Sequence, residues 1–313
     1  MGSVTAVLEI GPETLRETMV WIPGGTFVMG SDHHFAEEAP AHEVTVSGFW
    51  MDRWPVTNAD FAAFVRATGY MSVAERMPDP EQYPDVNPSL LVPGSLLFRR
   101  PPLEADLRNQ LNWWTYVPGA CWKQPGGPGT AINALERHPV VHIAYEDAQT
   151  YAAWAGKQLP TEAEWEFAAR GGLSEREFAW GDDLTPNGVF MANTWQGEFP
   201  TEDQALDGFA GTSPVGTFPP NGYDLHDMIG NVWEWTRDWY GRHQRESVRP
   251  GASVRDSTST QRLPDVQIPR KVVKGGSYLC APNHCRRYRP AARMAQAIDT
   301  STCHLGFRCI IRP

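Results

Sequence analysis

Hydrophobic and polar positions alternate most clearly near the two ends of the chain. Residues 19–31 (MVWIPGGTFVMGS) predict two short strands around a Pro-Gly-Gly turn, and residues 42–52 (HEVTVSGFWMD) alternate as a further strand would. Residues 272–279 and 306–312 predict closing strands. The pattern therefore places short strands at the beginning and at the end of the fold.

Three helices are predicted between these strands. Thr57 is placed as the N-cap of a helix whose apolar residues follow at helical spacing and which ends at Gly69. A second helix is predicted for residues 145–155. A third begins at Thr161, because Glu164 follows three residues later and completes a capping box.

The rest of the chain carries little periodic signal. Residues 76–108, 178–239 and 241–269 are irregular, and the chain contains 28 Gly, 27 Pro and 13 Trp. Abundant Gly and Pro without a repeat indicate ordered loops, which buried Trp side chains or bound ions can hold in place. We expect an α+β fold, a single mixed domain with little regular secondary structure, in which the polar segment 241–269 is mobile.

Charge and hydropathy exclude two classes of partner. With 27 Lys and Arg against 37 Asp and Glu, the formal net charge is −10, which disfavours binding to nucleic-acid phosphates. No stretch approaches the roughly 18 apolar residues of a membrane helix. Residues 1–12 lack the basic and apolar parts of a secretory signal. We therefore expect a cytoplasmic protein with no nucleic-acid and no membrane partner.

The cysteines carry the chemical interest. Their number, five, is odd, which argues against a disulfide framework. Two of them, Cys280 and Cys285, are separated only by Ala-Pro-Asn-His. Three interpretations stay open: a structural or locally bonded pair, part of a zinc site that lacks a second Cys/His pair, or a two-thiolate site for a soft metal such as copper(I). Thiolates would be favoured by four arginines if these lie close, namely Arg286, Arg287, Arg289 and Arg293.

A series of motifs in fixed order resembles the formylglycine-generating enzymes, also called sulfatase-modifying factors. The matching segments are 22–31 (IPGGTFVMGS), 55–70, 118–122 (PGACW), 138–173, 192–200 (ANTWQGEFP), 219–239, 275–293 and 305–309 (LGFRC). Within them, LPTEAEWE and GNVWEW are typical of a superfamily with a C-type-lectin-like core. The cysteine pair within GGSYLC and CRRYR is typical of its oxidase branch. The resemblance implies a family domain over residues 19–313, preceded by an N-terminal extension at residues 1–18.

The resemblance implies a specific reaction. Such enzymes oxidise the cysteine of a Cys-x-Pro-x-Arg segment in an unfolded sulfatase to Cα-formylglycine, with dioxygen and an external thiol reductant. Copper(I) is the implied cofactor, with Cys280 and Cys285 as its ligands and the substrate thiolate as a third sulfur. An oxidation by dioxygen needs such a cofactor, because no amino-acid side chain supplies that chemistry.

Further site residues follow from the same resemblance. Ser277 is implied as a polar residue near the oxygen-binding region, and Trp233 as an aromatic wall of that pocket, with core packing as its alternative. His284 stands where many relatives have Tyr, so that imidazole could replace phenol as a hydrogen-bond donor or titrate near neutral pH. Trp113 and Trp114 resemble an aromatic wall near the substrate cleft.

Two structural calcium ions are also implied. The first site comprises the side chains of Asn193 and Asp207 and the carbonyl groups of Thr194 and Phe209. The second comprises the side chains of Asp227 and Glu234 and the carbonyl groups of Gly230 and Val232. Calcium prefers several oxygens of mixed kinds on a loop. Without the resemblance, these residues would be interpreted as solvated loop residues.

The other cysteines and two histidines are expected to be structural. Cys309 matches a disulfide-bonded cysteine of secreted relatives, but the position of its partner is Ala169 here, so we expect a free thiol. Cys121 and Cys303 lie in no motif, and two histidines, His138 and His142, are interpreted as packed core residues.

Two alternative functions compete with the oxidase. A non-catalytic binding module on the same fold would not need the cysteine pair. An iron-dependent sulfoxide synthase would need an additional N-terminal helical domain, for which a family core that starts near Met19 leaves no room.

Overall fold

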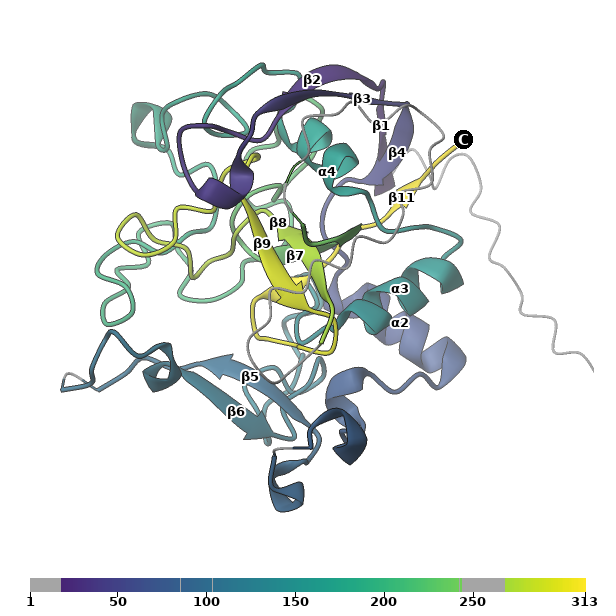
Figure 1. The fold of residues 1–313 in the computed structure, drawn as a ribbon, viewed down its shortest axis with the longest axis vertical. Coiled ribbons are helices and arrows are strands. Elements are labelled where there is room, and N and C mark those ends of the chain that lie inside the picture. Colours follow the sequence, from purple (N-terminus) through teal and green to yellow (C-terminus); the bar gives the residue numbers. More distant parts are fainter. Residues whose placement is uncertain (1–17, 85, 103, 242, 244–267) are drawn as a thin grey trace, which may run out of the picture.

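The computed structural model describes residues 18–84, 86–102, 104–241, 243 and 268–313. These residues form a mixed fold in which strands and ordered loops outweigh helices (Figure 1). Within the described ranges, the α-helices labelled in Figure 1 are α2 (Asn58–Thr68), α3 (Tyr145–Trp154) and α4 (Glu162–Ala169). Short 3-10 helices are η1 (Ala36–Glu38), η2 (Val73–Glu75), η3 (Pro80–Gln82), η4 (Pro88–Leu90), η5 (Gln110–Asn112) and η6 (Pro186–Gly188). No helix in these ranges is both long enough and apolar enough to span a bilayer.

A four-stranded sheet lies at the centre of the fold, with the strand order β10-β7-β8-β9. Its strands are β7 (Trp233–Trp239), β8 (Arg270–Lys274), β9 (Arg293–Ala297) and β10 (Leu305–Gly306). Strands β7, β8 and β9 are antiparallel, whereas β10 runs parallel to β7. The segment that carries the cysteine pair connects β8 to β9, so both of its ends are fixed by this sheet.

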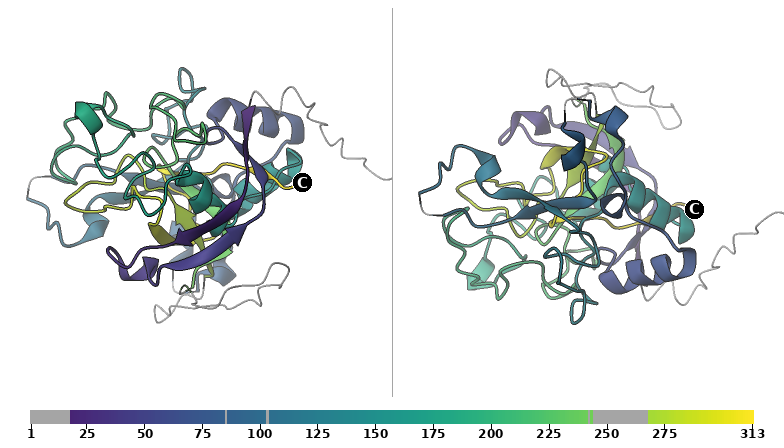
Figure 2. Two further views of the ribbon diagram at one scale, coloured as in Figure 1. Left: turned by 90° about the horizontal axis from the view of Figure 1, so that it is seen from above. Right: turned by 90° about the horizontal axis from the view of Figure 1, so that it is seen from below.

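In the described part of the chain, three smaller sheets accompany the central one. Strands β1 (Met19–Ile22), β4 (Phe49–Asp52) and β11 (Ile310–Ile311) bring the two ends of the described chain together. Strands β2 (Gly25–Met29) and β3 (His42–Val46) form a ribbon, and β5 (Gly94–Phe98) pairs with β6 (Trp114–Pro118). The β5–β6 hairpin lies below the central sheet in Figure 1 and faces the viewer in the right-hand view of Figure 2.

The two capped helices begin where the sequence predicts. Thr57 Oγ1 accepts the backbone N–H of Asp60 while the Asp60 carboxylate accepts that of Thr57. Thr161 and Glu164 form the same reciprocal capping box at the start of α4. Each box satisfies two N–H groups that a helix start leaves without a partner. At the other end of α2, Gly69 adopts a left-handed conformation with φ 70°.

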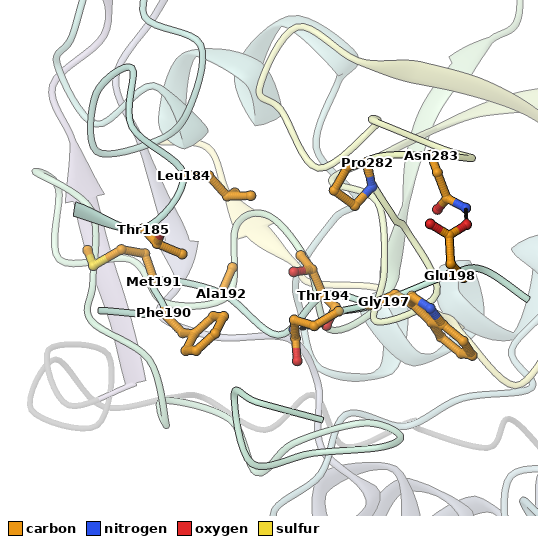
Figure 3. Close-up of a pocket in the computed structure, with 12 residues that line it drawn as sticks. Leu184, Thr185, Phe190, Met191, Ala192, Thr194, Gly197, Glu198, Pro282 and Asn283 are labelled. Atoms are coloured by element: carbon orange, nitrogen blue, oxygen red, sulfur yellow. Dashed lines mark hydrogen bonds between the residues drawn. The ribbon is translucent and has the colours of Figure 1, made fainter. Parts of the chain in front are cut away.

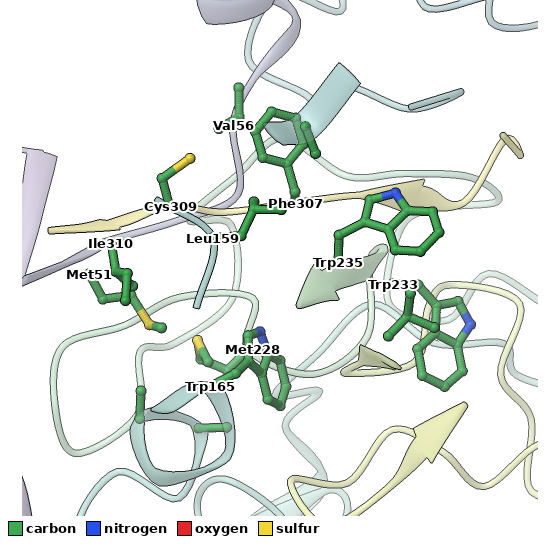
Figure 4. Packing of buried hydrophobic residues seen from close by; sticks show 14 of the residues in the cluster. Met51, Val56, Leu159, Trp165, Met228, Trp233, Trp235, Phe307, Cys309 and Ile310 are labelled. Atoms are coloured by element: carbon green, nitrogen blue, oxygen red, sulfur yellow. The ribbon is translucent and has the colours of Figure 1, made fainter. Parts of the chain in front are cut away.

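Buried aromatic side chains fill the space between the sheets and helices. The main cluster includes Trp165 from α4 and Trp233 and Trp235 from β7, all at most 2 % exposed (Figure 4). A second, smaller cluster comprises Trp113, Trp195, Phe199, Leu279 and Ala281. Since the second cluster includes residues on both sides of Cys280, the aromatic packing extends to the cysteine segment.

The structure confirms the α+β class with few helices but corrects several predicted strands. The two strands predicted in residues 19–31 are present as β1 and β2, but they belong to different sheets, because β1 pairs with β4 and β2 pairs with β3. The single strand at 42–52 is two strands, and the strand predicted for 272–279 ends at Lys274. Strands β5, β6, β7 and β9 lie in segments that were not predicted as strands. Most of the 241–269 segment, predicted to be mobile, lies outside the described residues.

Candidate functional site

Two glycines direct the chain from β8 into the cysteine segment. Gly275 and Gly276 have φ values of 96° and 71°, a region that side chains disfavour. A Cβ on Gly276 would lie 2.9 Å from the carbonyl oxygen of Arg287. Residue 276 must therefore be glycine, because the chain leaving β8 passes close to the backbone at Arg287. The two glycines also turn the chain, so β8 cannot continue to residue 279.

A tight turn brings the two cysteines together. The N–H groups of His284 and Cys285 both donate to the carbonyl of Ala281, at 3.2 and 3.0 Å. As a result, the sulfur atoms of Cys280 and Cys285 lie 3.2 Å apart. All five cysteines, each within the described part of the chain, are free thiols. The pair is thus close but unbonded, so both sulfurs remain available to a soft metal ion.

The two sulfurs differ in their electrostatic surroundings. A hydrogen bond from the thiol of Cys280, together with the charge of Arg287, lowers the pKa of Cys285 to about 6, against the opposing effect of burial. Burial raises the pKa of Cys280 well above its usual range. In the absence of metal, Cys285 is therefore the thiolate at neutral pH and Cys280 is the thiol that donates to it.

One of the four arginines near the pair contacts a sulfur. Arg287 Nη1 lies 3.8 Å from Cys285 Sγ. The other three are bound by carboxylates elsewhere: Arg286 by Glu177, Arg289 by Glu38 and Arg293 by Glu162. Of the four arginines, Arg287 is therefore the one that favours the thiolate. The other three anchor the cysteine segment to the rest of the fold.

The predicted residues around the pair lie at different depths. Ser277 is fully buried, and its backbone N–H points to Cys280 Sγ at 3.4 Å. Trp233 is buried in the same cluster as Cys280. His284 is exposed on one side, while its ring stacks on Phe199 with centroids 4.3 Å apart and meets the edge of Trp113. Partial burial and the nearby Arg287 charge lower the pKa of His284, which favours a neutral ring at neutral pH.

His304 was not predicted from the sequence as a site residue, but it lies against Ser277 and Trp114. Its Nδ1 is 2.9 Å from Ser277 Oγ, and Trp114 packs on its ring with centroids 5.0 Å apart. Trp113 and Trp114 thus both face residues of the cysteine site. In contrast, His142 is buried between Ser95 Oγ and the carbonyl of Pro125, which agrees with its interpretation as a packed core residue.

A cavity of about 310 Å³ opens beside the cysteine turn. Pro282 and Asn283, which separate the two cysteines in sequence, form part of its wall (Figure 3). Asn283 Nδ2 donates to Glu198 Oε2 at 3.0 Å across the rim. The remaining lining is mostly apolar and comes from residues 184–185, 190–192 and 194–197. The turn is therefore accessible from a concave, largely apolar surface.

The residues of the first implied calcium site contain an unpaired buried oxygen. Asn193 is 1 % exposed, and its Oδ1 has no hydrogen-bond partner. Asp207 lies on the facing loop, where its carboxylate accepts the N–H groups of Thr194 and Phe209. Burial raises the pKa of Asp207. Because buried polar atoms are nearly always satisfied, this oxygen fits a cation ligand, as does the mixture of amide, carboxylate and carbonyl oxygens.

The residues of the second implied site are more fully paired. Glu234 is bound by Arg308 through both oxygens, at 2.7 and 2.8 Å, and also by Trp165 Nε1. Asp227 is buried, which raises its pKa, and one oxygen accepts the N–H of Gly216. Gly230, with φ 77°, and the buried Val232 lie between them. The described part of the chain has no cluster of three or more His, Cys, Asp or Glu placed to hold a metal, so any ion here would depend on carbonyl oxygens.

Comparisons with known proteins give a consistent result. The model of the sulfatase-modifying factor enzyme 1-like domain matches residues 5–313. A formylglycine-generating enzyme from Mycobacterium tuberculosis is 51% identical over 94% of this chain and 98% of its own length. An inactive Cα-formylglycine-generating enzyme 2 from Mus musculus is 43% identical over 93% of this chain and 84% of its own. Among solved structures, PvdO from Pseudomonas aeruginosa aligns with a TM-score of 0.59 and 25% identity over 94% of each chain.

Proposed function

Because the chain belongs to the formylglycine-generating enzyme family, we propose that it is a copper-dependent oxidase of cysteine in Cys-x-Pro-x-Arg segments. Its substrate is an unfolded sulfatase, which the resulting formylglycine activates. For each cysteine converted, dioxygen and two thiols from an external reductant are consumed. The products are the aldehyde, hydrogen sulfide, a disulfide and water.

One observation carries this proposal: two free thiols lie 3.2 Å apart and one of them is acidic. Cys280 and Cys285 are the residues that would hold copper(I), since two soft thiolate ligands suit this ion. When bound, copper(I) supplies the activation of dioxygen that no side chain provides. Arg287 stabilises the thiolate form of Cys285 before the metal binds.

The surrounding residues are suited to an extended peptide. Beside the cysteine turn, the exposed ring of His284 stacks on Phe199 and meets Trp113, two aromatic side chains that are buried beneath it. The adjoining cavity presents apolar side chains with Asn283 and Glu198 at its rim. Such a surface offers side-chain pockets to a segment without structure of its own. Ser277 directs its backbone N–H to the sulfur of Cys280, and Trp233 packs in the same buried cluster. Cys280 is 2 % exposed, and this burial keeps bulk water from its sulfur.

We also propose that calcium holds the loops behind the cysteine turn. Asn193 and Asp207 contribute side chains to the first site, and the unpaired Asn193 oxygen supports this assignment. Trp195, two residues later, donates its backbone N–H to the carbonyl of Cys280 at 3.1 Å. An ion here would therefore stabilise the position of the cysteine segment. For the second site, centred on Asp227 and Glu234, Arg308 already balances one negative charge, so we propose weaker binding there.

The alternative function is a non-catalytic binding module. It deserves a test because a relative that is named inactive shares 43% identity with this chain. The unbonded pair, with its acidic member beside Arg287, favours the oxidase, since a binding role gives no reason for two adjacent free thiols.

Oxygen uptake tests the proposal. Adding a Cys-x-Pro-x-Arg peptide to protein with copper(I) and a thiol should raise dioxygen uptake above the background of thiol oxidation, whereas a Ser-x-Pro-x-Arg peptide should have no effect. Cys280→Ala and Cys285→Ala should each abolish the peptide-dependent uptake. Cys121→Ala is the matched control, because Cys121 is also a buried free thiol but lies in another segment. Uptake that persists in either pair variant would contradict the two-ligand site.

A further inference from the structure

His304 contacts two of the residues that surround Cys280. Its ring nitrogen Nδ1 lies 2.9 Å from the hydroxyl of Ser277. Its backbone carbonyl accepts the N–H of Trp233 at 2.8 Å. Ser277 in turn donates its own N–H toward Cys280 Sγ at 3.4 Å. A single residue at the entry to β10 therefore contacts Ser277, which is bonded to the buried sulfur, and Trp233, which packs in the same buried cluster as Cys280.

The surroundings of His304 fix the position of its ring. Trp114 packs against it, and burial lowers the pKa of His304 to about 3, so the ring is neutral under all ordinary conditions. The neighbouring Cys303 is anchored too, because its sulfur accepts the N–H of Phe98 and the hydroxyl of Tyr278. The segment therefore contacts the β5–β6 hairpin on one side and residues 277–278 on the other.

The Ser277 hydroxyl depends on this ring for its orientation. The Ser277 oxygen also accepts the backbone N–H of Leu279 at 3.2 Å. The other hydrogen bond of the hydroxyl is made to the His304 ring, which therefore fixes how the hydroxyl is rotated. Ser277 is fully buried, and a buried hydroxyl that loses a partner either rotates or stays unsatisfied. The geometry of the space beside Cys280 therefore changes when the imidazole is lost.

We propose that His304 is a positioning residue of the oxidase, which orients the Ser277 hydroxyl and the Trp233 backbone relative to Cys280. This inference rests on the proposed function. His304 itself touches neither sulfur, so it acts through Ser277. Since His304 does not line the cavity beside the cysteine turn, its loss should affect kcat and not the KM for peptide.

Four variants and one control test the role. His304→Leu keeps bulk without the hydrogen bond, and it should lower kcat on the order of tenfold with KM unchanged. Ser277→Ala should lower kcat by a similar factor, and the double variant should be no slower than the slower single variant, because both remove one interaction. His304→Asn places a polar atom near the Nδ1 position and should stay within about threefold of the wild type. His138→Leu, at a histidine bonded to Thr212, is the control and should keep full kcat.

A copper(I) competition titration adds a readout that is independent of turnover. His304→Leu should bind copper(I) within about threefold of the wild type, since both sulfurs remain in place. If the leucine variant does not fold, His304→Ala replaces it with the same expectations. Multiplicative losses in the double variant, an Asn variant as slow as the Leu variant, or a large loss of copper affinity would each overturn the positioning role. Absence of turnover in the wild type would instead refute the proposed function.

Discussion

Arg287 is anchored beside Cys285, with Nη1 3.8 Å from the sulfur. Its Nη2 is bound to Glu37 at 2.5 Å, and its guanidinium lies over the ring of Phe35 at 3.9 Å. A cation with two such contacts has little freedom to leave the thiolate. The N-terminal segment around η1 thus contributes to the electrostatics of a cysteine near the other end of the chain.

This relationship predicts how the metal-free protein reacts with an alkylating reagent. A thiol with a lowered pKa is reactive above that pKa and loses reactivity as the pH falls through it. Cys285 should therefore alkylate with a midpoint at about pH 6, whereas Cys280, whose pKa is raised, should react only at alkaline pH. Peptide mapping by mass spectrometry after short exposures at each pH measures both profiles.

Variants identify the cause of the acidity. Cys280→Ala removes the hydrogen bond from its thiol, the largest acidifying influence on Cys285, and should move the midpoint upward. Arg287→Ala should move it in the same direction by removing the charge. If Cys285 of the wild type alkylates with a midpoint pH ordinary for a thiol, the proposed difference in pKa between Cys285 and Cys280 is wrong.

Calcium removal should lower thermal stability before it affects the reaction. An ion that binds only the folded state at 100 times its Kd stabilises by roughly 2.7 kcal/mol, which corresponds to a Tm change of about 4 °C for a chain of this size. Differential scanning calorimetry with and without a chelator measures the change. Asn193→Ala should lower Tm in calcium and respond little to the chelator. An equal response in wild type and variant would reject Asn193 as a ligand.

A buried ion pair between η1 and the cysteine segment should contribute strongly to stability. Arg289 and Glu38 are joined by two hydrogen bonds of 2.9 and 2.5 Å, and both are at most 1 % exposed. Glu38→Gln leaves a buried guanidinium without its counter-charge and should cost about 3–5 kcal/mol of unfolding free energy. Urea denaturation measures the loss. Glu43→Gln, on the exposed side of β3, should change little, and similar losses in both variants would contradict the account.

The features predicted most accurately from the sequence are those determined by interactions between residues close together in the chain. The starts of α2 and α4 were predicted because capping boxes lie within four residues. The approach of Cys280 to Cys285 was suggested by their spacing and by family resemblance. The β5–β6 hairpin was missed because its strands lie in a Pro-rich stretch and pair across a long insertion.

Long-range contacts explain the rest of the differences. His304 reaches Ser277 across 27 positions of the chain, and no local pattern marks it as part of the site. Four arginines followed the pair in sequence, but only the fold distinguishes Arg287 at the sulfur from Arg289 on Glu38. The strand predicted to reach residue 279 ends earlier, because Gly275 and Gly276 turn the chain.

Mass spectrometry of a Cys-x-Pro-x-Arg peptide tests the central claim most directly. The peptide would be incubated with the protein, copper(I), a thiol reductant and air, and any aldehyde would be trapped with an amino-oxy reagent. We predict a product in which the thiol carbon has become an aldehyde, absent without copper and absent with Cys280→Ala or Cys285→Ala. An unchanged peptide after incubation with folded protein that carries copper on both cysteines would contradict the oxidase assignment and favour the binding module.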